Sequence, residues 1–217
     1  MPDRPGAPTR AWQRMLSGRR LDLLDPSPLD VEITDIAHGL ARVARWNGQT
    51  LGDHAFSVAQ HSLLVEQIFC RRLPHATPDE RLTALLHDAP EYVIGDMISP
   101  FKAVVGGGYK LIEERLQRAI HLRFSLGASM DEKLKKEIKK ADQVAAYFEA
   151  TLLAGFQIGE AAKFFGRPSG IVLGPEDLSP QPVKCIEAAF LSRFNEIETL
   201  RAAQPARREL REDAKAG

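Results

Sequence analysis

Apolar side chains recur every three to four residues along most of the chain, and this spacing predicts a helical protein. A first helix is expected behind Thr34 and Asp35, with its stripe ending near Asn47-Gly48. Thr77-Pro78 is typical of a helix start, with Thr as the cap and Pro as the first helical residue. The expected helices cover residues 33–47, 55–73, 77–88, 111–124, 129–154 and 183–203.

The remaining segments predict little regular structure. Residues 12–16 and 19–24 flank the turn-forming pair Ser17-Gly18, which predicts a short two-stranded hairpin. A turn and a short helix are expected over residues 95–102, followed by a flexible joint at 106–108. Residues 155–180 are rich in Gly and Pro and give no clear prediction. The fold class expected is therefore all-α, a single helical bundle with a small N-terminal β-hairpin decoration.

Length and composition favour one globular core of modest size. The expected organisation is an N-terminal extension over residues 1–30, one helical domain over 31–204 and a disordered charged tail over 205–217. Lys and Arg number 29 and Asp and Glu number 29, so net charge favours neither nucleic acid nor a membrane as partner. Cys70 and Cys185 lie far apart, as expected of reduced thiols. Without a signal-like or long apolar segment, a soluble cytoplasmic protein with a small-molecule partner is expected.

Two histidines and two aspartates stand in apolar, helix-like surroundings. They are His61, His87, Asp88 and Asp142. Burying such groups without partners costs on the order of several kcal/mol, which a shared ion would offset. Imidazole with carboxylate suits one divalent Mn, Co, Fe, Ni or Zn ion, and Mg less well. The alternative is that His61 is a hydrogen-bonded core histidine and Asp142 an isolated polar residue of a helix.

These four residues form part of a resemblance that covers roughly residues 35–150. Their order is similar to that of the HD-domain superfamily of metal-dependent phosphohydrolases. The chain more particularly resembles the bacterial 5′-deoxynucleotidases of that superfamily. The motifs that carry this resemblance are Arg45-Trp46, Gln60-His61-Ser62, His87-Asp88-Ala89-Pro90-Glu91, Gly95-Asp96, Pro100-Phe101-Lys102 and Lys139-Lys140-Ala141-Asp142.

The resemblance implies a helical bundle with the metal ligands on its inner faces. It implies that Glu91 orients or activates the attacking water and that Asp96 contacts the leaving group or the sugar. It also implies that Arg45-Trp46 shapes a deoxyribose pocket that excludes a 2′-hydroxyl. Family members are commonly dimers, so a homodimer is expected.

The residues themselves leave alternatives open for these acidic groups. Glu91 faces the metal side only if the helix that carries Asp88 persists through Pro90, and otherwise it is an exposed acid at a helix end. Asp96 also suits a turn cap. Retention of both acids beside the ligands favours catalysis, because metal binding alone does not need them.

Basic and aromatic residues supply candidate substrate contacts. Lys102 and Lys139 are candidates for binding phosphate, and Lys139 lies on nearly the same helical face as Asp142, although helical lysines are usually solvated. Arg45 suits phosphate and Trp46 suits a sugar or a base, the alternative being a helix-end cation and a core aromatic.

The other histidines add no second metal site. His38 is expected on one helical face with Arg42 and Arg45, and lining of the cleft is the less favoured of its two interpretations. His54 is expected as a cap or surface residue, His75 in a loop and His121 in solvent. A single metal is therefore expected.

The activity expected is hydrolysis of deoxynucleoside 5′-monophosphates to deoxynucleoside and phosphate. A deoxynucleoside triphosphate triphosphohydrolase is the first alternative, and a guanosine tetraphosphate hydrolase is a more distant one. A non-catalytic, metal-dependent nucleotide-binding module is the alternative outside enzymes.

Overall fold

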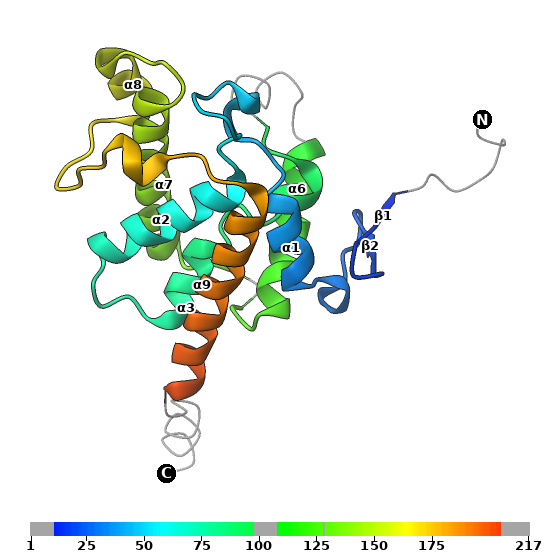
Figure 1. The fold of residues 1–217 in the computed structure, drawn as a ribbon. Helices are drawn as coiled ribbons and strands as arrows, with labels where there is room; N and C mark the ends of the chain where they lie inside the picture. Colours follow the sequence, from blue (N-terminus) through cyan, green and yellow to red (C-terminus); the bar gives the residue numbers. More distant parts are fainter. Residues whose placement is uncertain (1–10, 98–107, 128, 205–217) are drawn as a thin grey trace, which may run out of the picture.

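The computed structural model describes residues 11–97, 108–127 and 129–204, and helices dominate it (Figure 1). The helices are α1 (Ile33–Leu40), α2 (Val58–Arg72), α3 (Pro78–Leu85), α4 (Glu91–Ile94), α6 (Gly108–Arg123), α7 (Glu132–Leu152), α8 (Ile158–Phe165) and α9 (Val183–Ala203). Short 3-10 turns are η1 (Pro28–Asp30), η2 (Arg45–Gly48) and η3 (Pro175–Leu178). The all-α fold class is confirmed, and so is the small N-terminal hairpin.

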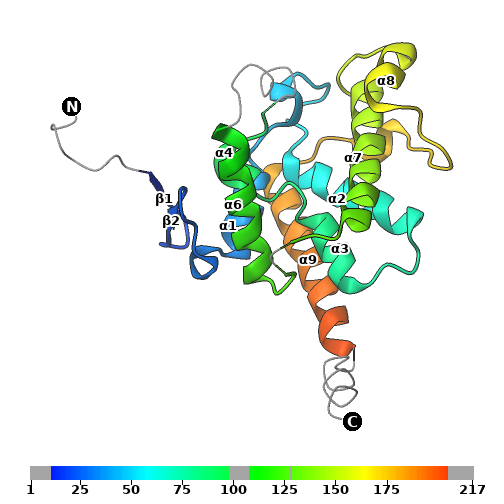
Figure 2. The same ribbon diagram turned by 180° about the vertical axis from the view of Figure 1, so that it is seen from behind.

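The hairpin pairs β1 (Trp12–Arg14) with β2 (Arg20–Asp22) in antiparallel register. It lies at the edge of the bundle beside α1, as both views show (Figures 1 and 2). Asp35 of α1 is buried and accepts hydrogen bonds from Ser17 N at 2.9 Å and Ser17 Oγ at 2.5 Å. This carboxylate therefore ties the turn of the hairpin to the helical domain.

Side-chain caps start the helices that position the site. Ser57 accepts a hydrogen bond from Gln60 N at the start of α2. Thr77 and Glu80 form the reciprocal capping box of α3, with Pro78 as its first residue, which confirms the predicted start. Asp131 caps α7, so the predicted start at Ser129 is wrong by two residues.

The first helix is shorter than predicted because strand-like pairing replaces its last turns. Ala44 is extended and forms an antiparallel bridge with Ser57, flanked by the hydrogen bonds Arg45 N–Phe56 O at 2.8 Å and Val58 N–Val43 O at 2.9 Å. Trp46 and Asn47 then adopt φ of 55° and 51°, outside the α-helical region. The apolar side chains after Leu40 have a helical spacing in the sequence, but pairing with the residues around Ser57 determines the backbone conformation instead.

The C-terminal helix α9 packs along one side of the bundle with a single buried face (Figures 1 and 2). Its stripe of Ile186, Phe190, Phe194 and Ile197 is buried, as predicted, and the helix packs against α1, α2 and α3 (Figures 1 and 2). A second cluster of apolar side chains joins α2 to α7. The predicted stripe of α9 is thus covered by its own chain and offers no ready surface to a second copy.

The segment that gave no clear prediction contains α8 and η3. The helix α8 packs against α7, and Ala161 is its buried residue. Gly155 and Gly166 lie just outside its two ends with φ of +76° and +78°, a conformation that glycine adopts without strain. In the part of the chain that is described, no helix has the length and apolarity needed to cross a bilayer.

Candidate metal centre

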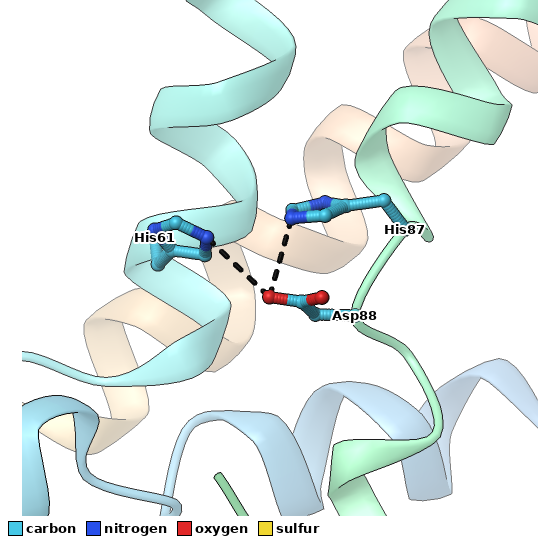
Figure 3. A group of neighbouring side chains, drawn as sticks. All are labelled: His61, His87 and Asp88. Carbon is cyan, nitrogen blue, oxygen red and sulfur yellow. Dashed lines mark ion pairs between the residues drawn. The ribbon is translucent and has the colours of Figure 1, made fainter. Parts of the chain in front are cut away.

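Three of the four predicted metal ligands converge on one point. His61 comes from α2, while His87 and Asp88 lie in the turn between α3 and α4 (Figure 3). One ligand atom from each lies within 4.8 Å of the others. Asp88 Oδ2 is 3.4 Å from His61 Nε2 and 3.2 Å from His87 Nε2.

The fourth predicted ligand, Asp142 of α7, adjoins this group at His61. Its Oδ1 lies 3.4 Å from His61 Nε2. Its other oxygen accepts a hydrogen bond from Lys139 Nζ at 2.7 Å. Asp142 therefore needs only a local adjustment to complete a four-residue set with the three ligands above.

Hydrogen bonds at the far nitrogens fix how both imidazoles point. His61 Nδ1 lies 2.5 Å from Glu149 Oε1, and His87 Nδ1 lies 2.9 Å from Ala84 O, so each Nδ1–H donates to an oxygen. In a neutral ring with its proton on Nδ1, Nε2 carries a lone pair, and both Nε2 atoms are buried and face Asp88 without a hydrogen bond in the described residues. A divalent ion accepts such lone pairs, so this donor set fits a metal. Without an ion, a protonated His61 ring satisfies the same two aspartates, so metal binding displaces that proton.

The charges around the centre favour a cation. Burial raises the pKa values of Asp88 and Asp142, but the neighbouring histidines outweigh it and hold both well below the usual range. Burial and Arg45 lower the pKa of His61, but Glu149 and the two aspartates outweigh them and raise it. The aspartates are therefore anionic at neutral pH, as metal ligands must be.

Glu149 of α7 is the site residue that the sequence analysis missed. Its side chain is fully buried, and it accepts hydrogen bonds from His61 Nδ1, from Arg45 at 3.3 Å and from Trp46 Nε1 at 2.9 Å. Burial raises its pKa, but His61 and Arg45 outweigh this and lower the pKa to about 2. Its position seven residues after Asp142, two helical turns within an apolar run, was the signal available in the sequence.

Arg45 and Trp46 lie at the site but do not close the first helix, which corrects the prediction. They belong to η2, directly after the extended residue Ala44. Arg45 Nη1 also donates to Asp96 Oδ2 at 3.1 Å, and the side chains of both residues are largely buried. The guanidinium is thus held by Asp96 and Glu149, and these two carboxylates raise its pKa although burial opposes them.

Glu91 reaches the site without the helical continuation on which its prediction depended. The helix α3 ends at Leu85, the chain turns through residues 86–90, and Glu91 then opens α4 directly after Pro90. Its side chain is buried, so it is not an exposed acid at a helix end. Glu91 lines the same cleft as Asp88 and Asp142.

That cleft has a volume of about 720 Å³ and contains most of the predicted site. Arg45, Trp46, Asp88, Glu91, Asp96, Lys139 and Asp142 all line it. Phe156, Phe164 and Phe165 also line it and were not predicted, because the segment that carries them gave no clear pattern. Lys102, the remaining predicted contact, and the joint at 106–107 lie outside the described residues, while Gly108 opens α6. A second cleft of about 610 Å³ is lined by Glu66, Cys70 and Arg193, among others, and by none of the predicted site residues.

The remaining histidines divide between surface and core. His54 and His75 are exposed, as predicted. His38 lies 3.4 Å from Glu187 of α9 rather than in the cleft. His121 is buried, so the prediction that it is solvated is wrong, and Gln117 Nε2 lies 2.7 Å from its Nε2.

Fold and site together define an all-α protein with a His-His-Asp group, of which His61 is buried and Asp88 lines a cleft. The chain belongs to the same family as an uncharacterized protein of Rhodobacter capsulatus, to which it is 56% identical over 186 residues. That alignment covers 86% of this chain and 95% of the relative. No protein-family model matches the chain.

Proposed function

We propose that this protein is a metal-dependent phosphohydrolase of the HD type that acts on deoxynucleotides. The activity proposed is that of a 5′-deoxynucleotidase, which releases deoxynucleoside and phosphate from deoxynucleoside monophosphates. The observation that carries the proposal is the pair of buried Nε2 atoms of His61 and His87, which both face Asp88, with Asp142 adjoining. The proposal includes a cytoplasmic homodimer, which fractionation and light scattering would check.

His61, His87, Asp88 and Asp142 would hold one divalent Mn, Co, Fe, Ni or Zn ion. Nitrogen with oxygen ligands suits these metals better than Mg. When bound, such an ion lowers the pKa of water toward neutrality and polarises a phosphoryl oxygen. The polar side chains of the cleft then have separate tasks.

Glu91 is the proposed general base, because its buried carboxylate lines the cleft with the ligand Asp88. Lys139 is the proposed phosphate contact, because its Nζ lies 2.7 Å from Asp142 and its side chain is 66% exposed. Trp46 is the proposed wall against the sugar, held by its Nε1–H to Glu149. Asp96, bonded to Arg45, is the proposed contact to the sugar or the leaving group.

The test is to strip the purified protein with a chelator and restore Mn, Co, Fe, Ni, Zn or Mg singly. Each form is then assayed for phosphate and triphosphate release from deoxy- and ribonucleotides of every phosphorylation level. Metal-dependent phosphate release from deoxynucleoside monophosphates is the expected result. Triphosphate release would favour the triphosphohydrolase instead, and tight nucleotide binding without turnover would favour a binding module.

A matched pair of variants assigns any activity to this site. His61→Asn should abolish both metal retention and turnover, because it removes a ligand and the bond to Glu149. His54→Asn should change neither, because His54 is exposed. Equal metal content in the two variants would place the metal elsewhere and reject the proposal.

A further inference from the structure

The cleft of the candidate metal centre is lined by charged and by aromatic side chains. The charged ones include Asp88, Asp142, Glu91 and Lys139. The aromatic ones are Trp46, Phe156, Phe164 and Phe165. A ligand that fills this cleft therefore needs both an ionic group and an apolar body.

The four aromatic rings form one continuous cluster. The Trp46 ring lies 5.6 Å from Phe156 and 5.9 Å from Phe165, measured between ring centroids. Phe164 lies 6.4 Å from Phe156 and 6.2 Å from Phe165. These separations are typical of edge-to-face and tilted aromatic packing, so the rings support each other as a single surface.

Phe164 is the ring of this cluster that remains open. It is 66% exposed although it lines the cleft, whereas Phe156 and Phe165 are half-buried. Aromatic surface left in water at the wall of a cleft gains free energy when a flat apolar group covers it. Among the four rings, Phe164 therefore has the most exposed surface for a ligand to cover.

The Glu149 carboxylate connects the aromatic side chains of the cleft to the proposed metal ligand His61. Trp46 Nε1 donates to Glu149 Oε2 at 2.9 Å, while Glu149 Oε1 accepts the bond from His61 Nδ1. The ring cluster is thus tied to His61 through a single buried side chain. A ligand with its charge at the metal ligands must extend its neutral part along the rings.

We propose that Trp46, Phe156, Phe164 and Phe165 form a base-binding subsite, in which the purine or pyrimidine of the nucleotide stacks on Phe164. This inference rests on the proposed function and specifies which part of the substrate the cleft recognises. Stacking tolerates any base, because every base has a flat aromatic face. The subsite therefore requires a base without selecting one.

The test compares two substrates of the metal-restored enzyme, dAMP and 2-deoxyribose 5-phosphate. They share the deoxyribose and the 5-phosphoester and differ at C1 of the sugar, which carries adenine in dAMP and a hydroxyl in 2-deoxyribose 5-phosphate. Phe164→Ala should raise KM for dAMP about tenfold, leave kcat for dAMP within about twofold and leave turnover of 2-deoxyribose 5-phosphate unchanged. Phe164→Trp should restore KM. Ile158→Ala is the matched control, since Ile158 is an exposed apolar residue of α8 that does not line the cleft.

An equal change with both substrates, or no change with dAMP, would overturn the subsite. A wild-type enzyme that hydrolyses neither compound would reject the proposed function, and calorimetric titration of the metal-restored protein with the same two compounds then decides the subsite. Binding of dAMP that exceeds that of 2-deoxyribose 5-phosphate and is lost in Phe164→Ala would support it. Absence of dAMP binding, or equal binding by the variant, would reject it.

Discussion

At the scale of single residues, Glu149 connects several residues of the candidate site. Its buried carboxylate accepts hydrogen bonds from His61, a proposed metal ligand, and from Arg45 and Trp46, which line the cleft. Such an outer partner orients a ligating imidazole and raises its basicity. Glu149 is therefore a positioning residue rather than a catalytic one.

Glu149→Gln should weaken metal binding about 10- to 100-fold, the usual effect of losing an outer carboxylate. The amide keeps the shape of the side chain but removes its charge, so the hold on His61 Nδ1–H becomes weaker. Competition with a chromogenic chelator measures the dissociation constant. Glu160→Gln, an exposed change on α8, is the control. Equal affinity in both variants would show that Glu149 does not orient His61.

Glu91→Gln should lower turnover at least about 100-fold, which is the usual contribution of a general acid or base. The amide cannot accept the proton from the attacking water. Metal content, measured on the same preparation by mass spectrometry, should stay at the wild-type level because Glu91 is not among the ligands. An unchanged rate would remove Glu91 from the mechanism.

His121 predicts how stability depends on pH. Gln117 Nε2 donates to Leu86 O at 3.1 Å and faces the Nε2 lone pair of His121, which requires a neutral ring. Burial lowers the pKa of His121 in the folded protein. As the pH falls below about 6.5, the unfolded chain takes up a proton that the folded chain resists, so stability is lost on the acid side.

Urea unfolding at pH 7.5 and 5.5 checks this prediction against His121→Gln. The wild type should lose more free energy of unfolding than the variant over this range, by at most about 1.4 kcal/mol per pH unit. A variant with the same pH dependence as the wild type would contradict the prediction.

At the scale of elements, apolar periodicity and capping residues predicted the helices that are long or that begin with a clear cap. The helix α9 and the start of α3 agree with these predictions. Two predicted helix ends, at residues 41–47 and 86–90, were wrong. Pairing with residues 56–58 and the turns after α3 determine the backbone conformation there. These breaks deliver Trp46, Asp88 and Glu91 to the cleft, so the departures from regular structure concentrate where the site is built.

Some residues of the candidate site can be recognised from their neighbours in the sequence, whereas others depend on contacts with distant parts of the chain. His61, His87 and Asp88 were found because polar residues stood out in apolar runs. Glu149 also stands in an apolar run, but its role depends on partners about a hundred residues earlier in the chain. Phe164 was missed because the short helix α8 is flanked by Gly- and Pro-rich sequence.

Because α1 and α4 pack closely at Gly39, adding one methyl group there should lower stability and turnover. A Cβ added at Gly39 would lie 2.8 Å from both Cβ and the carbonyl oxygen of Tyr92, so α4 must move. Gly39→Ala should cost about 1–3 kcal/mol by overpacking, and it should reduce turnover by displacing the adjacent Glu91. Thermal unfolding and the phosphate assay measure the two effects.

Gly159→Ala is the control for this change. A Cβ at Gly159 meets no atom within 4 Å, and alanine favours the helix, so stability should hold or rise by up to about 1 kcal/mol. A Gly39→Ala protein as stable and active as this control would show that the crossing is not tight.

At the scale of the whole molecule, the bundle and the ion should stabilise each other. The ligands come from α2, from the turn after α3 and from α7, and the unfolded chain does not hold them together. An ion present at 100 times its dissociation constant should add about 2.7 kcal/mol to the free energy of unfolding. For a chain of this size the melting temperature should rise by roughly 5–10 °C.

Calorimetry of stripped and metal-restored protein measures this shift. His87→Gln should lose most of it, because the centre then lacks one of its two imidazoles. A shift of equal size in the wild type and in this variant would indicate metal binding elsewhere on the chain.

The attachment of α8 carries a consequence for how this family can diversify. The helix buries Ala161, is flanked by Gly155 and Gly166, and joins the rest of the site through the contacts of Phe156 and Phe165 with Trp46. The ion ligands reside on different segments. Exchanging residues 156–165 between homologues should therefore transfer ligand preference while the proposed metal ligands stay unchanged. This short segment is thus a suitable one to exchange in protein engineering.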